Sequence, residues 1–256
     1  MSELPVISVQ GVSKSFRQND GGLLEVLHSV SLDIAQGEII AIIGHSGCGK
    51  TTLLRIVCGF EQADNGFVLL DGERHMWPSK NALMLFQDFN QLLPWKTVLG
   101  NVMYPLLAGR DVRSRQDVKK HALKRIKDVG LEGFEKSYPH QLSGGMKQRA
   151  AVARALALQP RVLLMDEPFA SLDNITRGTL QTLTRHVCEK YGISALLVTH
   201  SVEEAAVMAD KIIVMDKNPG RIKTILDNDV KDAPPEERAI LTARALSFLG
   251  GEEALS

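Results

Sequence analysis

Residues 38–60, "EIIAIIGHSGCGKTTLLRIVCGF", decide the fold of this 256-residue chain. The stretch begins with the apolar, β-branched run 38–43, which predicts a short buried strand. It continues into residues 44–51, which match the phosphate-loop pattern G-x-x-x-x-G-K-[ST] in full. Residues 51–60 then predict a helix. The loop therefore has the preceding strand and following helix that a phosphate loop requires, and the stretch predicts an α/β fold.

The loop itself predicts contacts to a nucleotide. Its glycines let backbone N–H groups turn toward a β-phosphate, Lys50 reaches the β- and γ-phosphates, and the Thr51 hydroxyl faces Mg²⁺. A nucleoside triphosphate and Mg²⁺ are therefore the predicted ligands. The alternative is a glycine-rich turn without function, and the flanking strand and helix argue against it. The predicted ligand residues in this segment are Gly44, His45, Ser46, Gly47, Cys48, Gly49, Lys50, Thr51 and Thr52.

Strand and helix patterns on both sides of the loop predict one sheet with an inserted helical block. Further strands are predicted at 4–16, 25–34, 67–72, 81–87, 161–166, 194–200 and 211–216. Alternation of strands with helices after residue 160 indicates a parallel sheet. The pattern is helical from about 97 to 157, which predicts an insertion. Ser201 and Glu204 fit a capping box for a helix over 201–210.

Composition limits the classes of partner. The chain has 30 basic and 30 acidic residues, so its formal net charge is zero and nothing in it points to nucleic acid. Its three cysteines, Cys48, Cys58 and Cys188, have no metal-ligand spacing, which is typical of a reduced intracellular protein. The apolar runs are too short to span a bilayer, and the N-terminus lacks a signal-peptide layout. Any work at a membrane is therefore expected to depend on a partner.

Polar residues end three of the predicted strands. Asp166 would lie near Mg²⁺ beside the phosphate loop, and Glu167 is placed to polarise an attacking water. His200 would bond the γ-phosphate, although a lone histidine is more often structural. Gln87 would bind Mg²⁺ or hold a water molecule through its carboxamide, and by itself it fits a surface residue better. A strand that merely ends in a charged turn is the alternative for the two acids. The predicted metal ligands are Thr51, Gln87 and Asp166.

A second anion-binding segment lies at 140–156, "HQLSGGMKQRAAVARAL". Ser143, Gly144 and Gly145 precede a basic helix, and a helix N-terminus with free N–H groups favours an anion. Adjacent glycines at such a position indicate close approach of the backbone to another group. The alternative is a flexible loop before an amphipathic helix, which does not explain the Leu-Ser-Gly-Gly order.

These motifs together resemble the nucleotide-binding subunit of ATP-binding-cassette (ABC) transporters. The order is the phosphate loop, Gln87, "LSGGM" (142–146), "LLMDEP" (163–168), "SLD" (171–173) and His200. The resemblance covers residues 4–226. It implies a P-loop NTPase fold with a RecA-like core, an antiparallel β subdomain and an α-helical subdomain inserted at about 88–157. Residues 227–256 are expected to form a short linker and one helix.

The resemblance also implies roles for single residues. Phe16 would stack on adenine, Glu167 would be the general base, and His200 would contact the γ-phosphate. Ser143, Gly144 and Gly145 would bind the γ-phosphate of ATP held by the opposite subunit. Asp173 would lie between the subunits. The chain is therefore expected to act as a homodimer, or as one of a pair of cassettes, with ATP at the interface.

Partners and location follow from the same resemblance. Two transmembrane permease subunits are expected to dock near Gln87–Val102, and a substrate-binding protein would act through them. The expected location is peripheral, on the cytoplasmic face of the cell membrane. The bulky residues Leu92, Leu93, Pro94 and Trp95 suit such a docking surface. Packing of the helical subdomain explains them equally well.

Details of the motifs are similar to one group of importers. Met146 replaces the family's usual glutamine, and "SLD" replaces the commoner "ALD". With "DEPFASLDNITR" and "FQDFNQLLPWKTVLGNV", this form resembles importers of nitrate, sulfonates and taurine. The alternative is a soluble single-cassette ABC ATPase of an assembly complex that transports nothing. A module that uses ATP only as a switch is disfavoured because both Glu167 and His200 are present.

Overall fold

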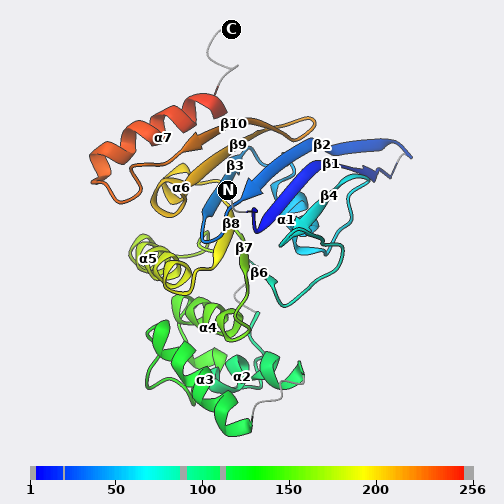
Figure 1. Ribbon diagram of the computed structural model, residues 1–256. Coiled ribbons are helices and arrows are strands. Elements are labelled where there is room, and N and C mark those ends of the chain that lie inside the picture. The colour runs from blue at the N-terminus through cyan, green and yellow to red at the C-terminus, as the bar shows by residue number, and fades with distance from the viewer. Residues whose placement is uncertain (1–3, 20, 87–90, 110–113, 251–256) are drawn as a thin grey trace.

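A six-stranded sheet forms the centre of the protein. The computed structural model describes residues 4–19, 21–86, 91–109 and 114–250. The strands of this sheet lie in the order β10-β9-β3-β8-β7-β6 (Figure 1). All neighbouring pairs are parallel except β10 with β9. The bounds are β3 Ile39–Gly44, β6 Ala82–Leu85, β7 Val162–Asp166, β8 Ser194–Val198, β9 Lys211–Asp216 and β10 Arg221–Asp227.

A second, antiparallel sheet precedes and follows β3 in the chain. Its order is β2-β1-β4-β5, which agrees with the expected antiparallel β subdomain. The bounds are β1 Ile7–Arg17, β2 Leu23–Ile34, β4 Asn65–Leu70 and β5 Glu73–Arg74. The strand predicted at 25–34 thus begins two residues earlier, and Asn65 and Gly66, predicted as a turn, already belong to β4.

Three helices form the predicted insertion between β6 and β7. Figure 1 shows α2, α3 and α4 gathered at one end of the molecule, with α7 at the other end. The helices of the described residues are α1 Lys50–Cys58, α2 Val98–Ala108, α3 Arg115–Asp128, α4 Gly144–Ala157, α5 Asn174–Tyr191, α6 Val202–Met208 and α7 Pro235–Leu249. Within these residues, no helix is both long and apolar enough to cross a membrane.

The core explains why β3 is apolar at every position. Ile40 and Ile42 pack in the cluster that joins the central sheet to α1 and to the antiparallel sheet. Ile39, Ala41 and Ile43 pack in the other cluster, with the insertion and α5, α6 and α7. Successive side chains of a strand point to opposite faces, so a strand buried on both faces needs an unbroken apolar run. The motif strand therefore holds the two halves of the core together.

The C-terminal segment is more firmly attached than a linker. Residues 221–227, which the sequence did not mark as a strand, form β10 on the edge of the sheet. Asn228 is buried, and its Nδ2 donates to the carbonyls of Ala206 and Ala209 at 2.9 and 2.7 Å. Further along, Leu241 and Ala245 of α7 are buried in the core. Helix α7 is therefore part of the folded unit.

Gly66 offers a test of the contact between β1 and β4. Gly66 and Gly72 have similar positive φ angles of 79° and 81°. A Cβ on Gly66 would lie 2.4 Å from the carbonyl oxygens of Gln10 and Gly11, whereas one on Gly72 would meet nothing within 4 Å. Gly72→Ala should therefore lower the free energy of unfolding by only the dihedral cost of about 1–2 kcal/mol. Gly66→Ala should cost clearly more, as measured by urea denaturation, and equal losses would contradict the steric explanation.

Candidate nucleotide-binding and catalytic site

The predicted site residues meet at the carboxyl edge of three neighbouring strands. Strand β3 pairs with β8 through Ile42 and Val198, and β8 pairs with β7 through Val198 and Asp166. The phosphate loop follows β3, His200 follows β8, and Glu167 follows β7. Ligands of open α/β sheets bind at this edge. The structure therefore brings together groups that are separated by more than a hundred residues in sequence.

The phosphate loop turns tightly between β3 and α1. Gly49 has a φ angle of 93°, a left-handed conformation that costs other residues about 1–2 kcal/mol. A Cβ there would lie 2.6 Å from Leu27 Cδ2 and 2.9 Å from the Val26 carbonyl oxygen. A Cβ on Gly44 would lie 2.7 Å from Cys48 Sγ. Both glycines are therefore required by the close approach of strand β2 and of the loop itself.

The polar groups of the loop fit a magnesium-bound triphosphate. Lys50 is buried, and its Nζ donates to the carbonyls of Gly44 and His45 at 2.7 and 3.1 Å. The Thr51 hydroxyl donates to Asp166 Oδ1 at 3.1 Å. One hydroxyl and one carboxylate thus stand together beside an ammonium group. These are the donors that hold Mg²⁺ and phosphate oxygens in P-loop proteins.

The surroundings of Asp166 disfavour its charged form when no cation is bound. Burial raises the pKa of this carboxyl group, the Thr51 hydroxyl bond lowers it, and the adjacent Glu167 carboxylate raises it. The more distant charges of Arg55 and Lys50 lower the pKa, and the net direction is upward. A divalent cation would lower the pKa of Asp166 and hold it in the charged form.

Glu167 and His200 contact each other at the same edge. Nδ1 of His200 lies 3.1 Å from Glu167 Oε2. The Glu167 backbone N–H donates to the Val198 carbonyl at 2.9 Å, and its φ angle is 44°. A non-glycine residue in this left-handed region is strained, and such strain gathers at functional sites. The carboxylate can accept a proton from a water molecule, and the imidazole can bond a phosphate oxygen.

The hydrogen bonds at the start of α6, next to His200 in the chain, differ in part from the predicted capping box. The Ser201 hydroxyl accepts from the Glu204 N–H at 3.2 Å, as predicted. The Glu204 side chain does not return to the Ser201 N–H. It accepts from the Thr199 hydroxyl at 2.7 Å, and the Ser201 N–H donates to that hydroxyl instead, at 3.0 Å. Arg177 of α5 lies 3.6 Å from Glu204, and burial raises the pKa of this carboxyl group.

The structure shows two contacts to the phosphate loop that the sequence did not predict. Gly220, before β10, approaches the loop so closely that a Cβ would lie 2.1 Å from the Cys48 carbonyl oxygen. His45 Nε2 lies 2.8 Å from the carbonyl oxygen of Leu249, the last residue of α7. The C-terminal part of the chain thus supports the loop from two sides. Its distance in sequence explains why local patterns did not reveal this.

The second anion-binding segment lies away from the phosphate loop of its own chain. Ser143 caps α4, and its hydroxyl accepts from the Met146 N–H at 3.3 Å. Gly144 is the first residue of the helix. A Cβ on Gly145 would lie 2.4 Å from Thr176 Cγ2 in α5. Close packing against α5 therefore explains a glycine at this position without any bound anion. Ser143, Gly145 and Thr176 line a cavity of about 320 Å³.

The remaining predicted residues divide between described and undescribed parts of the chain. Phe16 lies on β1, is 39% exposed, and has Lys14 Nζ 5.2 Å from its ring centroid. Gln87 lies outside the described residues. Asp173 caps α5 by accepting from the Thr176 N–H at 3.0 Å. Leu92 is 3% exposed and Trp95 is 70% exposed, so core packing accounts for the first and not for the second.

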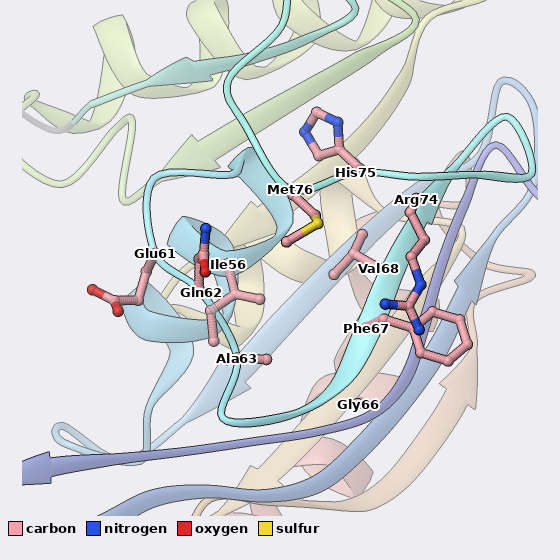
Figure 2. A pocket seen from close by; sticks show the side chains of 10 residues that line it. All are labelled: Ile56, Glu61, Gln62, Ala63, Gly66, Phe67, Val68, Arg74, His75 and Met76. Carbon is pink, nitrogen blue, oxygen red and sulfur yellow. The ribbon is translucent and has the colours of Figure 1, made fainter.

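A separate cavity of about 80 Å³ lies beside β4, between the end of α1 and β5 (Figure 2). The Arg74 guanidinium lies 4.7 Å from the centre of the Phe67 ring, and Figure 2 shows Met76 and Val68 pointing toward one another. Among the described residues that line it, none belongs to the predicted nucleotide site. We therefore do not assign this cavity to the nucleotide.

Solved structures of ATP-binding cassettes match the fold of most of this chain. A dimeric ATP-binding cassette in a post-hydrolysis state, bound to ADP and phosphate, superposes with a TM-score of 0.75 and 31% identity. The match covers 86% of this chain and 98% of that one. The RecA-like core, antiparallel subdomain and helical insertion are therefore confirmed as the fold.

Sequence relatives agree with the structural match. An uncharacterised ABC transporter ATP-binding protein of Methanocaldococcus jannaschii is 44% identical over 88% of this chain and 83% of its own length. An aliphatic sulfonates import ATP-binding protein of Bacillus cereus is 39% identical over 88% and 86%. A nitrate import ATP-binding protein of Synechococcus elongatus is 40% identical over 87% of this chain, which spans only 34% of that longer protein.

The family model described as ABC transporter matches residues 27–170, which run from β2 to the segment after Glu167. The match includes the phosphate loop and the Leu-Ser-Gly-Gly segment. With the fold and the relatives, it shows that this chain is a member of the ABC transporter family and an ATP-binding cassette ATPase.

Proposed function

We propose that this chain is the ATP-hydrolysing subunit of an ABC importer for a small anion such as nitrate, a sulfonate or taurine. The observation that carries the hydrolytic part is the contact of Glu167 with His200, beside the Thr51–Asp166 pair. The names of the nitrate, bicarbonate and sulfonate relatives support the importer and the class of substrate.

The geometry supports a simple division of labour in hydrolysis. Lys50 and the loop N–H groups bind the β- and γ-phosphates, and Thr51, Asp166 and Gln87 would hold Mg²⁺. The metal ion neutralises charge that develops on the phosphate oxygens. Glu167 accepts a proton from the water that attacks the γ-phosphorus, and ADP leaves with the electrons of the broken P–O bond. His200 orients the carboxylate and bonds the γ-phosphate.

A dimer completes the site in this proposal. The Ser143 end of α4 would bind the γ-phosphate of the ATP that the second copy holds, because a helix N-terminus favours a negative charge. Ile175 lies in the same cavity wall and is 85% exposed. A second copy that places its ATP against Ser143 would cover Ile175 as well. The solved dimeric cassettes support this arrangement.

Exposed aromatic residues support a permease partner. Phe60 and Phe86 stack with ring centroids 6.1 Å apart and are 50% and 40% exposed. The backbone of Trp77 lies against Gly59, and Trp95 precedes α2; their side chains are 69% and 70% exposed. Aromatic side chains are enriched in protein interfaces. We propose that the permease covers this surface, which places the chain on the cytoplasmic face of the membrane.

Glu167→Gln should abolish turnover and retain ATP binding. Loss of the general base is expected to lower kcat by about 10²–10⁴-fold, because the amide cannot accept the proton. With Mg²⁺ and ATP, the variant should then elute as a stable dimer in size-exclusion chromatography. ATPase assays and elution volume measure the two outcomes.

The matched control is Glu203→Gln, which makes the same change at an exposed glutamate in α6, close to His200 in the chain. It should leave kcat and oligomeric state as they are. If Glu167→Gln retained full activity, the assignment of the base would be wrong. If it bound ATP as a monomer, the dimer would be wrong.

Gly220→Ala should weaken ATP binding from behind the phosphate loop. Because a Cβ would meet the Cys48 carbonyl at 2.1 Å, the loop has to shift. A strain of about 1.4 kcal/mol would raise the Kd for ATP tenfold, as titration calorimetry would measure. Gly178→Ala in α5 is the control, since a Cβ there meets nothing within 4 Å. Equal affinities for the two variants would show that Gly220 does not support the loop.

Affinity purification from cells that express the chain tests the importer. We expect permease subunits to be recovered, and Trp95→Ala to reduce their yield relative to the unsubstituted chain. Ile240→Ala is the control, because Ile240 is 74% exposed on α7, which Figure 1 shows at the opposite end of the molecule from α2. Recovery of soluble assembly proteins without a permease would favour the alternative of an ABC ATPase that transports nothing.

A further inference from the structure

One side chain joins the end of β6 to the start of the segment that leads into α2. Phe86 N–H donates to Gln91 Oε1 at 3.2 Å, and Gln91 Nε2 donates to the Phe86 carbonyl at 2.5 Å. The carboxamide thus forms a two-bond pair with one residue's backbone, much as a neighbouring strand does. Residues 87–90, which lie outside the described residues, enter no step below. The pair fixes Gln91 relative to the central sheet.

Helix α4 holds the same residue from the other side. Arg154 Nη1 donates to the Gln91 carbonyl at 2.5 Å. Arg154 is half-buried, and this burial lowers the pKa of its guanidinium. A hydrogen bond from a charged donor in such surroundings is stronger than one at the surface. Gln91 is therefore fastened both to the sheet and to α4.

The position of Arg154 on α4 gives this contact a further consequence. Ser143, at the start of α4, precedes Arg154 by 11 positions, which correspond to about 16 Å along a helix. No proline interrupts the helix between them, and glycines occur only in its first turn. Trp95, in the exposed aromatic surface, follows Gln91 by four positions. A displacement of the Ser143 end would thus be carried by α4 to the segment that contains Trp95.

We propose that Arg154 is a positioning residue that makes the Trp95 segment follow helix α4 when ATP is bound. The inference rests on the proposed function, because it requires the Ser143 end of α4 to respond to nucleotide. Arg154 acts through Gln91 and touches no reacting atom. Replacement of Arg154 should therefore stop the Trp95 segment from responding to ATP and leave the affinity for ATP unchanged.

The chain provides its own reporter for this coupling. It contains two tryptophans, Trp77 and Trp95, so Trp77→Phe leaves Trp95 as the single indole. The test protein carries Trp77→Phe and Glu167→Gln, so that bound ATP persists. Trp95 fluorescence is recorded on addition of Mg²⁺ and ATP. Binding of a fluorescent ATP analogue and thermal unfolding are measured in parallel, because a merely structural role would alter these as well.

Three variants distinguish the outcomes. Arg154→Met keeps the apolar stem and removes the donor, so the ATP-induced Trp95 signal should be lost at unchanged nucleotide affinity. Arg154→Lys keeps a charged donor and should restore the signal at least in part. Arg115→Met, at an exposed arginine at the start of α3, should keep it fully. Should Arg154→Met not fold, Arg154→Gln takes its place, because it removes the charge and shortens the side chain, so the bond to the Gln91 carbonyl and the signal should be lost.

A Trp95 signal that persists in Arg154→Met, or in Arg154→Gln where that variant replaces it, would overturn the proposal. So would a Trp95 that does not respond in the parent protein although the analogue binds. Failure of the analogue to bind at all would overturn the proposed function together with this inference. The affinity measurement therefore separates the two failures.

Discussion

The parallel pairing of β3, β8 and β7 is the constraint on which the candidate site depends. Val198 pairs with Ile42 on one side and with Asp166 on the other, so the three strands end level with each other. Both faces of these strands are buried, and a slip of one residue would exchange every core side chain between the faces. The register is therefore fixed by the core. The relative positions of the phosphate loop, Glu167 and His200 follow from that register.

Helix α4 is positioned by its packing on other helices, whereas the register of the sheet positions the phosphate loop, Glu167 and His200. It contacts α5 through Gly145 and Thr176, packs on α2 and α3, and bonds Gln91 through Arg154. The sheet thus fixes the phosphate loop, Glu167 and His200, and in the proposed dimer a helix of the insertion carries the groups that contact the ATP of the second copy. A rigid helix that contacts both the Ser143 end and the Gln91 segment can join events at the nucleotide to events at an exposed surface. Such coupling needs a physical connection between two elements, and the arginine bond supplies one.

The sequence predicted the parts of the site that have local signatures. Strand, glycine loop and helix follow one another at 38–60, and acids end the apolar run 162–165, so the elements and their order could be recognised. The support of the loop by Gly220 and Leu249 could not, because each contact joins residues about 170 or more positions apart. The Glu204 side chain shows the same limit. Its spacing from Ser201 fits a capping box. In the structure, the carboxylate instead accepts a hydrogen bond from the buried Thr199 hydroxyl.

The left-handed backbone at Glu167 follows from where the sheet ends. Its N–H continues the pairing of β7 with β8 by donating to Val198, while its φ angle of 44° turns the chain away immediately afterwards. The conformation costs about 1–2 kcal/mol for a residue with a Cβ. A glycine would relieve that cost and remove the carboxylate. A glutamate kept at this position is thus held in place by the sheet, and the 3.1 Å contact with His200 arises because the neighbouring strand ends at the same level.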